Sequence, residues 1–259
     1  TSLALHGGGA NRPGWAGWRV APMPCRKRIG ANRQCWADWV SVLAGQHPII
    51  RQDLRGFAQS GPLPADQPLM DVLIDDVLEL MPDTEPVHLV GESAGGSILL
   101  ELALRHPARV ASLTLSNAAI VGRQIGQIGG WQALFDSGAD AWNDHMMACR
   151  FAPGALDPRA ADWYRMQQGR TRAESAMAIA ELLAGIDQRG ALPGLKPALM
   201  VLLPGDSPFV SPAMYADLPT WLPRAQLHRF PGVRHGLPFS HGRPCALLLQ
   251  DFLGGLNKT

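Results

Sequence analysis

The stretch Pro86-Val-His-Leu-Val-Gly-Glu-Ser-Ala-Gly-Gly96 decides how this chain is expected to fold. A short apolar run, typical of a buried strand, breaks there into the pattern G-x-S-x-G. Gly91 and Gly95 stand on either side of Ser93, where a sharp strand-to-helix turn tolerates no side chain. This context favours a strained, exposed and nucleophilic Ser93 over an ordinary tight turn.

The residues after this turn predict a helix. Positions 97–106 are strong helix formers, and Pro107 ends the run. The backbone N–H of Ala94 therefore lies near a helix N-terminus, where it is expected to stabilise an oxyanion.

Composition limits the classes of protein that fit. With 259 residues, of which 46% are hydrophobic and 17% charged, the chain can bury the core of one globular domain. A net charge of +1 gives no reason to expect a nucleic acid or an anionic membrane as partner. No apolar run approaches the roughly 18 residues of a membrane span. We expect a cytoplasmic protein, with secretion left open because the chain starts at Thr1 rather than Met, and the oligomeric state is open as well.

Short β-like runs alternate with helical patterns along the chain. Strands are expected at 2–5, 48–52, 86–91, 110–115, 197–203 and 226–230, and helices at 36–45, 69–81, 98–106 and 245–256. This alternation predicts an α/β fold with a mainly parallel sheet, helices on both faces, and functional loops at the carboxyl ends of the strands.

Residues 117–195 interrupt this rhythm. They indicate a helical cap inserted into a core made of 1–116 and 196–259. The block is rich in aromatic residues and methionines, which usually belong to a core. The alternative is that some of them line an apolar substrate pocket, with Trp131, Trp142 and Met146 as the candidates.

Four landmarks resemble the α/β-hydrolase superfamily, in its order and across nearly the whole chain. They are His6-Gly7-Gly8-Gly9 after the first strand, the D-x-R-G turn from Asp53 to Ser60, which resembles the family pattern D-x-R-G-x-G-x-S, the nucleophile elbow GESAGG, and a histidine after the last strand. The chain departs from the family at Ala58, where this turn usually has glycine. The family's first two strands are also lacking, which is expected to leave the strand near 48–52 at an edge of the sheet.

A serine hydroxyl needs a base, and the base needs an orienting carboxylate. His235 lies in a glycine-rich loop just after the final strand, which is the family's position for the base, and His241 is its competitor. The penultimate strand is followed by Pro-Gly-Asp-Ser-Pro, in which Asp206 is the only acid. Many relatives place the acid just before the proline, which is Ser207 here. We expect His235 as the base and Asp206 as its orienting acid.

The second oxyanion donor is expected in the loop after the first strand. Three glycines there let backbone N–H groups approach a substrate oxygen closely. Gly8 is expected to act beside Ala94, and Gly7, Gly9 and Glu92 are expected to contact the substrate. No phosphate-binding loop, dinucleotide fingerprint or metal-ligand spacing stands out, so we expect no cofactor and no metal.

The chain contains an internal repeat. GANRPGWAGW, which ends at Trp18, recurs 21 positions later as GANRQCWADW, which ends at Trp39, and seven of the ten residues are identical. A tandem duplication is the simplest explanation. Basic residues in and between the copies, Arg33 among them, are expected to form a solvated loop or, alternatively, to contact an anionic carrier or acyl group.

These features together predict hydrolysis of small-molecule carboxylic esters through an acyl-enzyme on Ser93. The same residues also serve carbon–carbon bond hydrolases, lactonases and perhydrolases. A ligand receptor built on a hydrolase scaffold is the alternative from another functional class.

Overall fold

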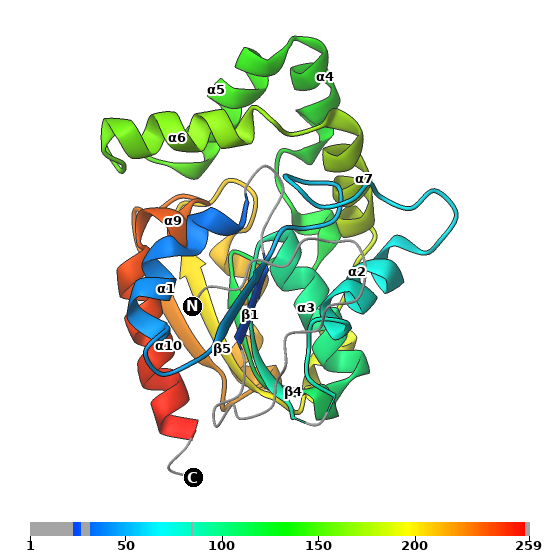
Figure 1. Cartoon of the computed structure of the whole chain (residues 1–259), viewed down its shortest axis with the longest axis vertical. Helices are drawn as coiled ribbons and strands as arrows, with labels where there is room; N and C mark the ends of the chain where they lie inside the picture. Colours follow the sequence, from blue (N-terminus) through cyan, green and yellow to red (C-terminus); the bar gives the residue numbers. More distant parts are fainter. Residues whose placement is uncertain (1–22, 27–31, 84, 257–259) are drawn as a thin grey trace.

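The computed structural model describes residues 23–26, 32–83 and 85–256. Within them, parallel strands form a six-stranded sheet in the order β2-β1-β3-β4-β5-β6 (Figure 1). The strands are β1 (Met23–Arg26), β2 (Ile49–Gln52), β3 (Val87–Glu92), β4 (Val110–Ser116), β5 (Ala198–Pro204) and β6 (Gln226–Phe230). The expected α/β fold is confirmed, and β2 lies at one edge of the described sheet.

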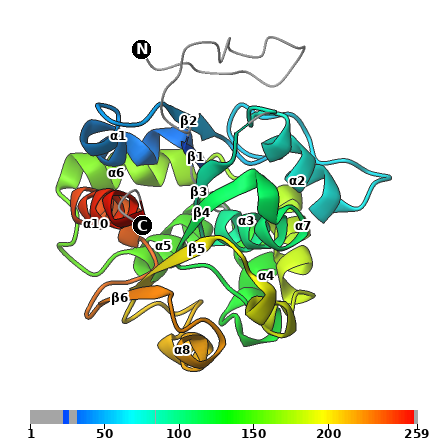
Figure 2. The same ribbon diagram turned by 90° about the horizontal axis from the view of Figure 1, so that it is seen from below.

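Helices cover both faces of this sheet (Figures 1 and 2). On one face lie α1 (Ala37–Leu43) and α10 (Gly242–Leu256), and on the other lie α2 (Leu69–Leu78) and α3 (Ala94–Arg105). Successive side chains of a strand point to opposite faces of the sheet, so they pack alternately against the two pairs of helices. In β5, Val201 belongs to the cluster with α2 and α3, whereas Met200 and Leu202 belong to the cluster with α1 and α10.

Four α-helices lie between β4 and β5 in the chain, and Figure 1 shows them grouped beyond one end of the sheet. They are α4 (Trp131–Asp136), α5 (Ala139–Arg150), α6 (Pro158–Gln168) and α7 (Ala173–Ala184), and we call them the helical segment. Two short helices, α8 (Leu218–Trp221) and α9 (Leu237–Ser240), flank β6. The division of the chain into a core domain and a cap domain stays a prediction.

Several boundaries differ from those expected. A 3₁₀ helix, Arg33–Trp36, precedes α1, while α2 ends at Leu78 and α3 begins directly after Ser93. The strand expected at 2–5 lies outside the described residues, whereas β1 was not predicted. None of the helices in the described part of the chain is long and apolar enough to cross a membrane.

Candidate active site

The turn between β3 and α3 holds Ser93 in a conformation that few residues adopt. Its φ of 52° and ψ of −126° lie outside the usual regions for an L-residue. The turn is also sterically tight. A Cβ atom on Gly91 would lie 2.6 Å from the Cα of Gly96, and one on Gly96 would lie 2.6 Å from the Cβ of Ala118. The glycines therefore allow the strained turn that presents the serine at the end of β3.

The backbone around Ser93 is fixed on both sides. Its own N–H donates to the carbonyl of Ser116 at the end of β4, at 2.8 Å. Ala94 is the first residue of α3, and the first four N–H groups of an α-helix have no carbonyl partner within the helix. The Ala94 amide thus lies next to the Ser93 hydroxyl at the positive end of the helix dipole.

The imidazole of His235 contacts this serine. Its Nε2 lies 3.0 Å from the Oγ of Ser93, and the residue is only 2% exposed. The ring of Phe209 packs edge-on against the imidazole, with 4.8 Å between centroids. The side-chain amide of Asn117, just beyond β4, donates to the backbone carbonyl of His235. The structure thus brings together the serine and histidine that the sequence singled out.

Ser207, and not Asp206, contacts the other nitrogen of the histidine. The Oγ of Ser207 lies 2.9 Å from Nδ1 of His235. Asp206 is exposed, and its carboxylate makes no hydrogen bond to a described residue. The backbone explains this difference from the expectation. Asp206 donates its amide to the carbonyl of Val233 at 3.0 Å, and this bond pins the turn so that the next residue faces the histidine.

The loop that carries His235 also caps the last turn of α5. The last four carbonyls of a helix have no partner within it. Here the Arg234 guanidinium donates to the carbonyl of Ala148 at 2.6 Å, and the amide of Gly236 donates to that of Arg150 at 2.8 Å. The amide of His235 adds a longer bond of 3.4 Å to the carbonyl of Cys149. Hydrogen bonds therefore join the histidine loop directly to the end of α5 in the helical segment.

A small cavity of about 30 Å³ opens onto the serine and histidine. Apart from a few polar groups its lining is apolar, with contributions from Trp131 of α4, Leu183 of α7 and Phe209. Arg150 is the one lining residue, among those described, with a permanent positive charge, and it is only 3% exposed. Its guanidinium donates to the Gln168 side chain and lies over the ring of Tyr164.

The other expected substrate-contacting residues occupy different places. Trp142 lies behind Trp131, with ring centroids 5.4 Å apart, and Met146 is fully buried in the main core cluster. Neither lines the cavity described above. Glu92 is fully buried towards α10, and the pKa of the Cys245 thiol in that helix is raised by burial of the thiol and, secondarily, by the charge of Glu92. Gly7, Gly8 and Gly9 lie outside the described residues.

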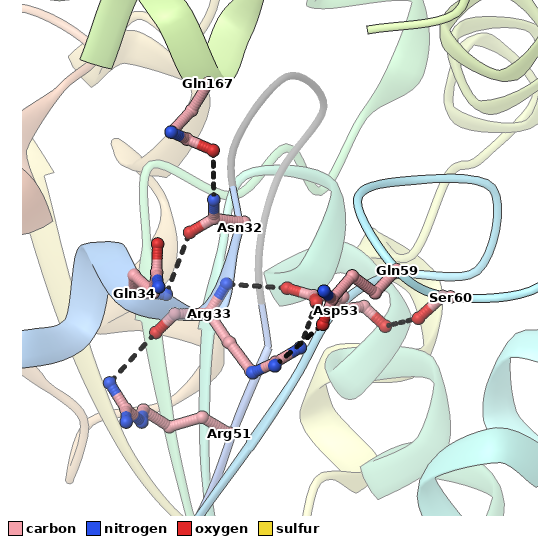
Figure 3. A network of polar contacts seen from close by, with 8 residues as sticks. All are labelled: Asn32, Arg33, Gln34, Arg51, Asp53, Gln59, Ser60 and Gln167. Atoms are coloured by element: carbon pink, nitrogen blue, oxygen red, sulfur yellow. Dashed lines mark hydrogen bonds and ion pairs between the residues drawn. The ribbon is translucent and has the colours of Figure 1, made fainter. Parts of the chain in front are cut away.

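A separate polar network fixes the D-x-R-G turn (Figure 3). The buried Asp53 accepts from the Arg33 amide at 2.6 Å and pairs with its guanidinium at 2.7 Å. The Asn32 side chain donates to that of Gln167 in α6 at 2.8 Å. The Arg33 expected in a solvated loop thus joins the second copy of the repeat to Asp53, beside a polar cleft of about 230 Å³.

Arg150 and Asn117 were not among the site residues expected from the sequence. Arg150 lies at the end of a helix whose polar residues look like an ordinary solvated face, and only the tertiary packing turns its side chain inward. For Asn117 a signal existed, because it directly follows the carboxyl end of a strand in an α/β fold. Its φ of 55° is one that asparagine tolerates better than most residues.

Comparisons with known proteins agree with this fold. The model of the alpha/beta hydrolase fold family matches residues 3–242. The chain is 28% identical over 272 residues to a 2-hydroxymuconate semialdehyde hydrolase of Pseudomonas sp. (strain CF600), covering 97% of this chain and 86% of that protein. It is 29% identical over 249 residues to a pimeloyl-[acyl-carrier protein] methyl ester esterase of Aromatoleum aromaticum, covering 87% and 95% respectively.

A solved structure is also similar in fold. The enol-lactonase from Burkholderia xenovorans LB400 superposes with a TM-score of 0.82 at 22% identity, over 92% of this chain and 93% of that one.

Proposed function

Because the chain belongs to the alpha/beta hydrolase fold family, we propose that it is a serine hydrolase that cleaves carboxylic esters through an acyl-enzyme. The observation that carries this proposal is the distance of 3.0 Å between the Ser93 Oγ and Nε2 of His235. Nucleophile and base within hydrogen-bond reach are the signature of nucleophilic catalysis.

The proposed chemistry has two halves. Nε2 of His235 takes the hydroxyl proton as the Ser93 Oγ attacks the ester carbonyl, and it returns that proton to the leaving alcohol. Water then attacks the acyl-enzyme by the same proton transfers and releases the acid. The Ala94 amide, and Gly8 by the sequence resemblance, stabilise the negative charge on the carbonyl oxygen.

Arg150 narrows the proposed substrate class. A buried guanidinium in the wall of an otherwise mostly apolar cavity favours a substrate with its own carboxylate, because charge-assisted hydrogen bonds are strongest away from water. We therefore propose an ester or lactone that carries a carboxylate. The names of the similar proteins, an esterase and an enol-lactonase among them, are in keeping with both bond types.

A substrate panel tests the proposal. Chromogenic acetate esters, succinate half-esters and lactones are compared on the wild type and on Ser93→Ala. Turnover should fall in the variant to the background rate, because the serine and the histidine act as a unit. A serine-directed phosphonate should label Ser93 alone. Turnover retained by Ser93→Ala would contradict the proposal, and binding without any turnover would favour a receptor.

The role of Arg150 has its own test. Arg150→Gln should lower kcat/KM for the succinate half-ester by about 10- to 100-fold, as expected for a lost charge-assisted hydrogen bond. Turnover of the neutral acetate ester should change much less. Arg165→Gln is the matched control, because Arg165 lies in the same helical segment and pairs at the surface with Asp144. Equal losses on both esters would assign Arg150 a purely structural role.

A further inference from the structure

The hydroxyl of Ser207 is the hydrogen-bond partner of Nδ1 of His235, and the partner of Nδ1 determines which ring nitrogen carries the proton. It lies 2.9 Å from Nδ1, on the opposite side of the ring from Ser93. In the neutral imidazole one nitrogen donates and the other accepts, and the partner of Nδ1 fixes which is which.

The other contacts of Ser207 determine what its hydroxyl offers the histidine. The backbone amides of Phe209 and Val210 both donate to its Oγ, at 3.3 and 3.1 Å. A serine hydroxyl has two acceptor lone pairs and one proton. With both lone pairs engaged by backbone amides, the remaining valence is the proton, and the hydroxyl donates it to Nδ1.

This arrangement places the ring proton on Nε2. If Nδ1 accepts from Ser207, the neutral His235 carries its hydrogen on Nε2, which then donates to the Ser93 Oγ. A nitrogen that already bears a proton cannot remove the one from Ser93. The reactive tautomer requires Ser207 to accept a third hydrogen bond or to release a backbone amide, so it is the minor form.

A carboxylate at the same position would reverse this preference. Two carboxylate oxygens offer about four lone-pair sites, which suffice for both backbone amides and for Nδ1–H at once. Asp206 does not supply this group, because its side chain is exposed and its backbone is held by Val233.

We infer that Ser207 is the positioning residue of His235, and that its hydroxyl holds the histidine in the Nε2–H tautomer. The inference rests on the proposed function for its kinetic consequence only. The wild type is then a slow ester hydrolase whose triad is completed by one substitution, Ser207→Asp.

The tautomer is measured without any substrate. Ring ¹⁵N chemical shifts of selectively labelled histidine, assigned by comparison with His235→Gln, should show protonated Nε2 in the wild type at pH 8. In Ser207→Asp the proton should move to Nδ1. Protonated Nδ1 in the wild type overturns the inference, whether or not the protein hydrolyses esters and whether or not the aspartate variant folds.

Kinetics supply the second test. Loss of the correct histidine tautomer in a serine protease costs about 10⁴-fold in kcat, so Ser207→Asp should raise kcat by about 100-fold or more with little change in KM. Asp206→Asn should leave kcat within about twofold of the wild type. A tenfold loss in Asp206→Asn, or no gain in a folded Ser207→Asp, overturns the inference. Gain in Ser207→Asp that survives Ser93→Ala would instead contradict the proposed function.

Discussion

The amide of Gly236 donates a hydrogen bond of 2.8 Å to the carbonyl of Arg150, at a point where no side chain fits between the two segments. A Cβ atom on Gly236 would lie 2.6 Å from that carbonyl oxygen and 2.1 Å from the Phe151 ring. Gly236→Ala must therefore push the histidine loop away from α5. We expect a loss of about 1–3 kcal/mol in the free energy of unfolding and at least a tenfold loss in kcat/KM.

Urea unfolding and ester turnover measure both effects. Gly190→Ala is the matched control, because a Cβ there meets nothing within 4 Å. If Gly236→Ala resembles this control in both measurements, the contact between the loop and α5 has no part in positioning His235.

The D-x-R-G turn contains a residue in the left-handed region. Ala58 has a φ of 49°, a conformation that costs an L-residue about 1–2 kcal/mol. Ala58→Gly should therefore raise the free energy of unfolding by about 0.5–1 kcal/mol, after the larger entropy of glycine in the unfolded chain is subtracted.

Equilibrium urea unfolding measures this gain. Ala133→Gly at an exposed position in α4 is the control and should lower stability by about 0.5–1 kcal/mol. A loss of stability in Ala58→Gly as well would show that this turn is not strained.

Local patterns predicted the sharp turn between strand and helix at Ser93, because the strand, the glycines and the helix formers around it are contiguous in the chain. They failed for β1. Met23–Arg26 contains Pro24 and Arg26 and shows no strand-like alternation, and its strand character comes from pairing with β2 and β3. The signal that could have found it is the repeat, since Met23–Arg26 stands 21 positions after the strand expected at 2–5.

The choice between Asp206 and Ser207 could not be made from the sequence either. The two residues are adjacent, and which one faces His235 depends on a hydrogen bond from Asp206 to Val233, which belongs to a distant loop. The rule that an acid follows the penultimate strand identified the turn that contacts His235. It did not say which residue of that turn makes the contact.

A pair of histidines, of which His47 is buried and His88 half-buried, predicts a dependence of stability on pH. His88 in β3 bonds through Nδ1 to the Ser112 hydroxyl at 2.8 Å and lies edge-on to His47, with 5.9 Å between centroids. Burial, and secondarily the neighbouring His47, lower the pKa of His88 from 6.5 to about 4. Between these values the unfolded chain binds more protons than the folded one. The free energy of unfolding should therefore fall as the pH falls from 6.5 to about 4, by at most about 3 kcal/mol.

Chemical unfolding at pH 7, 6, 5 and 4.5 measures this dependence. His88→Asn keeps a group that can bond to Ser112 and removes the titration, so its curve should be flatter than that of the wild type. Parallel curves for the two proteins would show that the pKa of His88 is the same in the folded and unfolded states.

Deletion of residues 10–30 tests what the repeat does. Its length equals the offset of the repeat, so Ser2–Leu5 would stand nine residues before Asn32, as Met23–Arg26 does now. β1 lies between two strands, where Pro24 cannot donate a hydrogen bond to the sheet, whereas Ser-Leu-Ala-Leu can do so at every residue. The shortened chain should therefore fold with equal or greater stability in urea. Its ester turnover should also rise, because Gly8, the second oxyanion donor by the sequence resemblance, then stands directly after the strand that pairs with β3. Pro24→Ala in the full chain is the control. It should raise the stability of the protein in urea without raising its ester turnover. Insoluble protein from the deletion would show that the fold requires Met23–Arg26 itself.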